Sequence, residues 1–217
     1  MASTDDLFRA IDEEDVARVR LLVDSDPSIA TARDPQGVSA LMRARYRRDK
    51  AIANAILPHV PELDVFEAAS FDDLDRLTRL LADDPTLATT MSGDGFTALH
   101  FAAFFGRHEA VALLLERGAD VDARGTGWMT GTALHSAASG GHTEAMRRLL
   151  EAGADPDARQ SHGFVALHAA AQNGRVDDVE LLLAYGADPS AANDDGATAR
   201  DLTTDDDVRA RLDQANA

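Results

Sequence analysis

A four-residue motif recurs along this chain at nearly constant intervals. TALH begins at residues 97 and 132, VALH at 165 and TARD at 198, which gives spacings of 35, 33 and 33 residues. Each of the first three leads through alanines and a glycine into a second apolar segment that ends in Gly-Ala-Asp. A fixed period of this length marks a repeat architecture, in which one unit cannot bury its own apolar face and must stack on its neighbours. We therefore expect a row of stacked units.

Each unit has the pattern of two helices joined by loops. In one of them, Leu99 and Ala102 share a face at helical spacing, and the small alanines allow the neighbouring unit to approach closely. Leu114 belongs to the larger apolar stripe of the second helix. Gly118 follows the last leucine of that stripe, where a left-handed turn ends a helix most easily at glycine.

The stretch GFTALHFAAFFGRHEAVALLLERGADVDA, residues 95–123, resembles the ankyrin repeat in nearly every motif. Turn, TALH-type start, double alanine, glycine and terminal Gly-Ala-Asp all recur in register over about residues 65–200. Alanine replaces the proline usual in that family at Ala98, Ala133 and Ala166. The resemblance implies an all-α solenoid of helix pairs with projecting finger loops.

The first third of the chain diverges, but a second period of 58 residues connects it to the rest. Asp26-Pro27 returns as Asp84-Pro85, and Leu41 returns as Leu99. We interpret this period as duplication of a two-repeat unit. Only 24 residues separate Leu41 from the equivalent Val65, so no finger loop fits between these two positions.

We expect a single ankyrin-repeat domain over residues 1–217, with about six to seven helix-pair units whose outer members act as caps. Its parts are divergent repeats at 4–62, clearer repeats at 63–192 and a C-terminal capping unit at 193–217. Ser3 with Asp6 predicts a capping box, and the acids at 205–207 suit the first turn of a helix.

Charge and composition limit the classes of partner. The chain has 21 Lys and Arg against 38 Asp and Glu, a formal net charge of -17, which would repel phosphates and anionic lipids over most of the surface. No run approaches the roughly 18 apolar residues that cross a bilayer, and no signal-peptide pattern opens the chain. The chain has no cysteine, which fits a reducing setting. We expect a soluble, cytoplasmic monomer that binds neither nucleic acid nor membrane.

Three histidines at equivalent positions, His100, His135 and His168, raise the question of a shared metal. Ligating nitrogens lie about 2 Å from a zinc ion, whereas packed helices lie about 8–10 Å apart, so these rings cannot converge. The resemblance implies instead that each histidine bridges backbone groups around its turn. Ser136 adjoins His135, but no acid is placed to complete a triad. We expect no metal, no cofactor and no enzymatic activity.

In ankyrin-like solenoids the finger tips and first helices line a concave face, which is the usual docking surface. Carried over position by position, this pattern predicts a surface for a partner protein of unknown identity, made of Tyr46, Arg47, Phe71, Phe96, Phe104, Phe105, Trp128, Met129, His162, Phe164, Gln172 and Asn173. Exposed aromatic rings lower solubility unless a partner uses them. The alternative is that these rings fill gaps between fingers and helices.

Two other functions stay open at this point. Phe105 and Trp128 would line an apolar pocket in a small-molecule-binding or enzymatic ankyrin protein, with His162 or His108 as proton carrier. An enclosed cavity containing a titratable side chain would distinguish that function from an open binding surface. A self-assembling role would show as a mass that depends on concentration.

The segment RARYRRDK, residues 43–50, holds five of the 21 basic residues. Helix geometry is expected to divide it, with Tyr46 and Arg47 on the concave side and Arg43 pointing elsewhere. The cluster is either solvated and internally paired, or it contacts an acidic partner, since one positive patch on a negative protein can set docking orientation.

Overall fold

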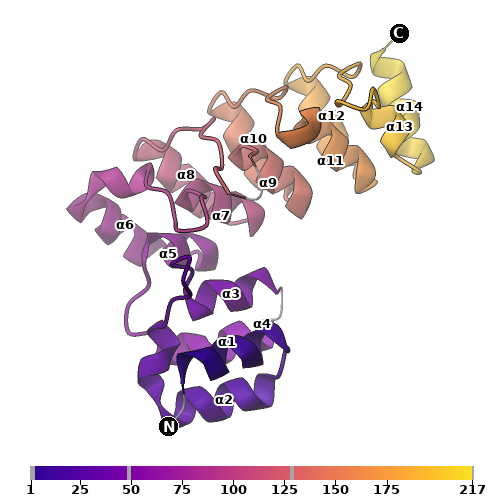
Figure 1. The fold of residues 1–217 in the computed structure, drawn as a ribbon. Coiled ribbons are helices and arrows are strands. Elements are labelled where there is room, and N and C mark those ends of the chain that lie inside the picture. The colour runs from indigo at the N-terminus through magenta and orange to yellow at the C-terminus, as the bar shows by residue number, and fades with distance from the viewer. Residues whose placement is uncertain (1–2, 48–49, 128–129, 217) are drawn as a thin grey trace. The chain divides into compact units, whose positions relative to one another are not determined.

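The computed structural model describes residues 3–47, 50–127 and 130–216 (Figure 1). Within these ranges, fourteen α-helices follow one another as seven pairs, and extended pairing is limited to three isolated β-bridges. The predicted all-α repeat fold is confirmed. The chain forms two compact units, Met1–Glu67 with Ser92–Asp94 and Ala68–Met91 with Gly95–Ala217, and the division falls within helix α5 (Val65–Phe71). A single domain stays a prediction.

The first unit is built from two helix pairs. Its helices are α1 (Thr4–Asp12), α2 (Val16–Ser25), α3 (Ala40–Tyr46) and α4 (Lys50–Ile56), with 3-10 turns at Pro27–Thr31 and Leu57–His59. Helix α1 packs on α3, and α2 packs on α4. Leu7, Leu41 and Ile52 are fully buried between them. Ser3 accepts a hydrogen bond from the Asp6 N–H at 3.1 Å, so the predicted N-terminal cap is present.

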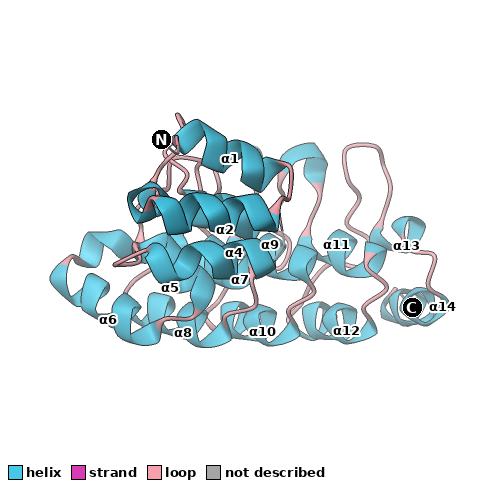
Figure 2. Cartoon of the chain, turned by 90° about the horizontal axis from the view of Figure 1, so that it is seen from below, coloured by secondary structure: helices cyan, strands magenta, loops and turns pink. Residues whose placement is uncertain are grey.

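The second unit contains two rows of helices (Figure 2). The first helices of its pairs pack in sequence, as do the second helices. The first row is α7 (Ala98–Phe104), α9 (Ala133–Gly140), α11 (Ala166–Gln172) and α13 (Ala199–Leu202). The second row is α6 (Leu74–Asp83), α8 (His108–Glu116), α10 (Thr143–Glu151), α12 (Val176–Ala184) and α14 (Asp206–Ala215), with 3-10 turns at Pro85–Ala88 and Ser161–Gly163.

The first helices of the second unit pack through alanine. Ala102 and Ala103 of α7 have no exposed surface, and neither do Ala137 and Ala138 of α9. Larger side chains at these buried positions should be unfavourable, because adding methylenes to a filled core costs typically 1–3 kcal/mol. The repeated double alanine therefore fixes the spacing between units.

Finger loops connect the pairs where the sequence predicts them. Isolated bridges pair Arg33 with Ser39 and Met91 with Thr97, each across a tight turn. Helix α4 ends at Ile56 and α5 begins at Val65. The described residues between them form a 3-10 turn and no hairpin, as the 24-residue spacing predicts.

The three equivalent histidines join each first helix to the loop of the next repeat. The Thr132 N–H donates to His135 Nδ1 at 3.2 Å, and His135 Nε2 lies 3.2 Å from the Phe164 carbonyl oxygen. Because the N–H group can only donate, Nδ1 must accept and the ring proton must lie on Nε2. His100 contacts Gly131, and His168 contacts Ala197, in the same way. The structural role that the resemblance implied for these rings is the one observed.

These histidines should make folding stability depend on pH. Burial lowers the pKa of His135 to about 4, against about 6.5 for an unfolded histidine. The stabilisation is therefore complete above about pH 6.5 and is lost as the pH falls toward the folded value. We expect the urea midpoint to fall between pH 7.5 and 5.0. His135→Asn should be less stable at pH 7.5 but show a smaller fall, and an identical fall in both proteins would contradict this assignment.

Glu14 is strained in a position that other repeats give to glycine. Its φ is 57°, and the equivalent Gly106 and Gly141 have φ of 68° and 69°. A side chain in the left-handed region costs roughly 1–2 kcal/mol. Glu14→Gly should raise the free energy of unfolding by about 1 kcal/mol, measured by urea denaturation. Glu14→Ala keeps a Cβ and is the control. An equal gain from alanine would show that strain is not the cause.

Candidate partner-binding surface

The C-terminal ends of α7, α9 and α11 lie next to one another in the second unit. A Cβ on Gly140 would lie 2.8 Å from the carbonyl oxygen of Phe104, which shows how closely α9 approaches α7. The Asn173 side-chain amide donates to the Ala138 carbonyl oxygen at 3.2 Å, which joins α11 to α9. We call this strip the first-helix edge; it consists of Phe104, Phe105, Ser139, Gly140, Gln172 and Asn173.

The aromatic residues at the two ends of α7 have different roles. Phe104 and Phe105 are half-buried, and their rings meet edge to face with centroids 5.2 Å apart. Phe96 is only 4% exposed and packs beside His100 and Phe101, with centroids 5.7 and 6.0 Å away. Phe96 thus has the alternative role of filling the gap between finger and helix, and it offers a partner no surface.

The finger loops of the second unit are held together by backbone hydrogen bonds. The Thr126 N–H donates to the Gly95 carbonyl oxygen at 2.9 Å, and the Asp194 N–H donates to the His162 carbonyl oxygen at 3.0 Å. His162 is exposed, with a left-handed φ of 61°. Phe164 is half-buried against the His168 ring, with centroids 5.2 Å apart. These bonds set the loop backbone before any partner arrives.

Of the four remaining predicted residues, the structure describes two. Gln172 is exposed on the first-helix edge, and Phe71 is half-buried at the end of α5. Trp128 and Met129 lie outside the described residues, and so does the Trp128 side of the pocket predicted with Phe105.

Two arginines of the basic cluster are paired within the first unit, whereas Arg48 lies outside the described residues. Arg43 donates from Nε and Nη2 to the two carboxylate oxygens of Asp12, both at 2.9 Å, and Arg47 donates to Asp12 Oδ1 at 2.9 Å. The expectation that Arg43 and Arg47 point apart is wrong, because residues four apart lie on the same face of a helix. The hydrogen bond from Arg43 is the largest cause that lowers the pKa of Asp12.

The hydroxyl of Tyr46 also has its hydrogen-bond partner within the first unit. Its hydroxyl donates to Asp94 Oδ2, and Ser92 donates to the other oxygen of that carboxylate at 2.5 Å. Burial, and then the hydrogen bond to Asp94, raise the pKa of Tyr46 far above its ordinary value. Tyr46 therefore ties α3 to the finger loop around Asp94.

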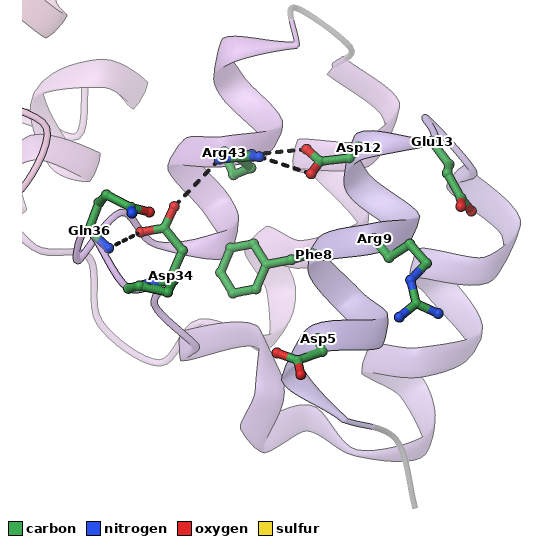
Figure 3. Close-up of a pocket in the computed structure, with 9 residues that line it drawn as sticks. Asp5, Phe8, Arg9, Asp12, Glu13, Asp34, Gln36 and Arg43 are labelled. Carbon is green, nitrogen blue, oxygen red and sulfur yellow. Dashed lines mark hydrogen bonds and ion pairs between the residues drawn. The ribbon is translucent and has the colours of Figure 1, made fainter. Parts of the chain in front are cut away.

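A hollow beside α1 in the first unit was not predicted from the sequence (Figure 3). Phe8 and Asp34 line it together with Asp12 and Arg43. The 58-residue period places Phe8 in register with Phe66, and this repeated aromatic residue was the one signal that the sequence contained. The approach of the loop at Asp34 has no such signal.

Comparison with known proteins agrees with this architecture. A three-copy description of ankyrin repeats matches residues 65–160 and 125–193, which together are more than half of the chain. The chain belongs to the ankyrin repeat family. Among the described residues of this ankyrin-repeat protein, no helix combines the length and apolarity needed to cross a membrane. The same residues contain no group of three or more His, Asp or Glu side chains arranged to hold a metal.

Curated relatives share only part of their length with this chain. A probable E3 ubiquitin-protein ligase, XBOS31, from Oryza sativa subsp. japonica is 48% identical over 62 residues, which are 28% of this chain and 14% of that protein. The E3 ubiquitin-protein ligase XB3 of the same plant is 48% identical over 63 residues, 29% of this chain and 14% of the ligase. Dauer abnormal formation protein 25 of Caenorhabditis elegans is 30% identical over 119 residues, 50% of this chain and 30% of its own length.

The contact between Tyr46 and Asp94 can be tested by alkaline titration. In a Tyr185→Phe protein, Tyr46 is the remaining tyrosine, so phenolate absorbance reports on it alone. We expect that absorbance to appear well above the ordinary tyrosine pKa of about 10 and to accompany unfolding. A raised folded pKa means that this stabilisation is present below about pH 10 and is lost above it.

Adding Asp94→Asn removes the second cause of the raised pKa of Tyr46, so ionisation should begin at lower pH. If Tyr46 of the Tyr185→Phe protein ionises near the ordinary tyrosine pKa of about 10, the hydroxyl is accessible to water and the prediction is wrong.

Proposed function

We propose that this protein is a non-catalytic scaffold whose second unit binds a partner protein along the first-helix edge and the adjoining finger loops. The observation that carries the proposal is the continuity of that edge over three repeats. It combines the paired rings of Phe104 and Phe105 with the exposed amide of Gln172. Aromatic anchors surrounded by polar positions are typical of protein interfaces.

The arrangement favours binding over chemistry. The three most buried titratable rings are His100, His135 and His168, and each holds its own turn to the next loop. Each of these histidines belongs to a different helix of the first row, so the three rings cannot act together on one substrate. The segments shared with the two named ligases are 14% of those proteins, and this chain has no cysteine. We therefore extend to this chain only a binding role.

The proposal also covers the classes of partner, the compartment and the oligomeric state of the protein. A formal charge of -17 disfavours nucleic acid and anionic membrane as partners. A chain without cysteine suits the reducing cytoplasm. We propose a cytoplasmic monomer, which sedimentation at several concentrations would test.

The proposal is tested by affinity capture with the full chain. Phe104→Ala with Phe105→Ala should reduce recovery of the bound protein at least about tenfold, since interface anchors contribute 2 kcal/mol or more. Gln172→Arg changes an exposed position of the same edge and should also reduce recovery without affecting folding. Bound proteins are quantified by mass spectrometry.

Leu21→Ala is the matched control, because Leu21 is an exposed apolar side chain, 70% accessible, in the first unit. Thermal unfolding would confirm that every variant is folded. Equal recovery by the control and by both edge variants would reject the first-helix edge.

A further inference from the structure

The hollow in the first unit has a volume of about 500 Å³ and opens to solvent beside α1. In Figure 3 the ring of Phe8 stands at its centre, between α1 and the loop that carries Asp34. Arg43 and Asp12 lie on one side of the ring, and Asp5 lies on the other. The hollow therefore combines an aromatic face with charged groups on several sides.

Most of these charges are already satisfied. Asp34 Oδ1 accepts the N–H groups of Gln36 and Val38 at 3.0 and 2.9 Å, and Asp34 Oδ2 lies 3.5 Å from Arg43 Nη1. The Arg43 guanidinium also bonds both oxygens of Asp12. A phosphate or carboxylate ligand would have to displace these bonds, so the hollow is not built for an anion.

Asp5 is the exception among the acids of the hollow. Its side chain is exposed at the edge, and no hydrogen bond or ion pair to its carboxylate occurs within the ranges the structure covers. Arg9 instead approaches Asp6 at 3.8 Å, and Glu13 approaches Arg18 at 3.8 Å. Four carboxylates and two guanidinium groups line the hollow, so its formal charge is -2.

We propose that this hollow receives a lysine or arginine side chain from a basic peptide segment of a partner protein. The aliphatic stem of that side chain packs on Phe8, and its cationic head lies beside the ring and Asp5. A cation over an aromatic face is attracted by the negative face of the ring. This site lies in the first unit and does not depend on the first-helix edge.

The volume of the hollow and the electrostatic field of the chain both favour a peptide segment over a single small amine as the occupant. Hollows of roughly 300–1,000 Å³ hold ligands much larger than one side chain, so residues beside the basic one also find room at the open mouth. The net charge of -17 attracts a basic polypeptide from a distance and speeds its encounter. An acidic segment is repelled by both the hollow and the whole chain.

The test uses a fluorescent nine-residue peptide, GSGRKRGSG, and a partner peptide in which glutamine replaces each basic residue. Fluorescence anisotropy with the full chain at low salt should show binding of the basic peptide alone, weakening as salt rises. Phe8→Leu keeps apolar bulk but removes the ring, and should lower affinity about threefold. Asp5→Asn should lower it by a similar factor.

Asp177→Asn is the matched control for charge. Asp177 is an exposed acid in the first turn of α12, as Asp5 is in the first turn of α1, so both variants change the net charge equally. Affinity should be unchanged by Asp177→Asn and by the Phe104 and Phe105 substitutions. If Asp5→Asn and Asp177→Asn lower the peptide affinity equally, the net charge of the chain explains the loss, and the proposed site is wrong.

Two further outcomes would also overturn the proposal. If Phe8→Leu binds as the parent does, the ring has no part in recognition. If spermidine displaces the peptide and binds as tightly, then the occupant is a small amine rather than a peptide segment. Thermal unfolding of Phe8→Leu and Asp5→Asn would show that each variant is folded before its affinity is compared.

Discussion

The second unit depends on the close packing of successive first helices, in which alanines are buried. Ala102, Ala137 and Ala170 are all fully buried, and only side chains this small let neighbouring helices approach in every repeat. This packing gives each histidine a carbonyl of the following loop within reach. It also keeps equivalent side chains in separate layers. Such an arrangement suits a surface that contacts an extended partner at several points, and it does not suit a single reaction centre.

The acidity of the chain has a structural origin as well as a consequence for binding. Asp15, Asp73 and Asp205 each accept a backbone N–H at the start of a helix, where a carboxylate is favoured by the helix dipole. Asp122 and Asp157 accept N–H groups from the turns of the next repeat, at 3.1 and 2.9 Å. Part of the negative charge therefore comes from aspartates that cap helices and hold turns. The resulting field still acts on any molecule that approaches, because a charge acts at a distance whatever its local role.

The repeat architecture could be predicted from the sequence because its signals are local and recur in register, as the TALH-type starts and Gly118 do. The first-helix edge could be named for the same reason, since Phe105 and Asn173 hold fixed places in that register. Phe96 was misjudged because its burial depends on contacts with His100 and Phe101 that the register does not describe. The hollow around Phe8 was missed because it needs the loop at Asp34 to lie beside α1, a contact between segments of different repeats. Such a contact leaves no period in the sequence.

The pairing of Arg43 and Arg47 could not be predicted either, because it depends on a residue of another helix. The sequence predicted that Arg47 faces the concave side and that Arg43 points elsewhere, but both converge on Asp12, whose carboxylate accepts from both. Exposed ion pairs of this kind contribute little individually, yet a bidentate pair holds its partners in one geometry. Asp12 belongs to α1 and Arg43 to α3, so the pair fixes the helix that carries Phe8 against its neighbour. With Arg43 and Arg47 bonded to Asp12, Asp5 is the acid of the hollow for which the described residues show no such pairing. In the proposed site for a basic peptide, the Arg43–Asp12 pair is therefore part of the wall.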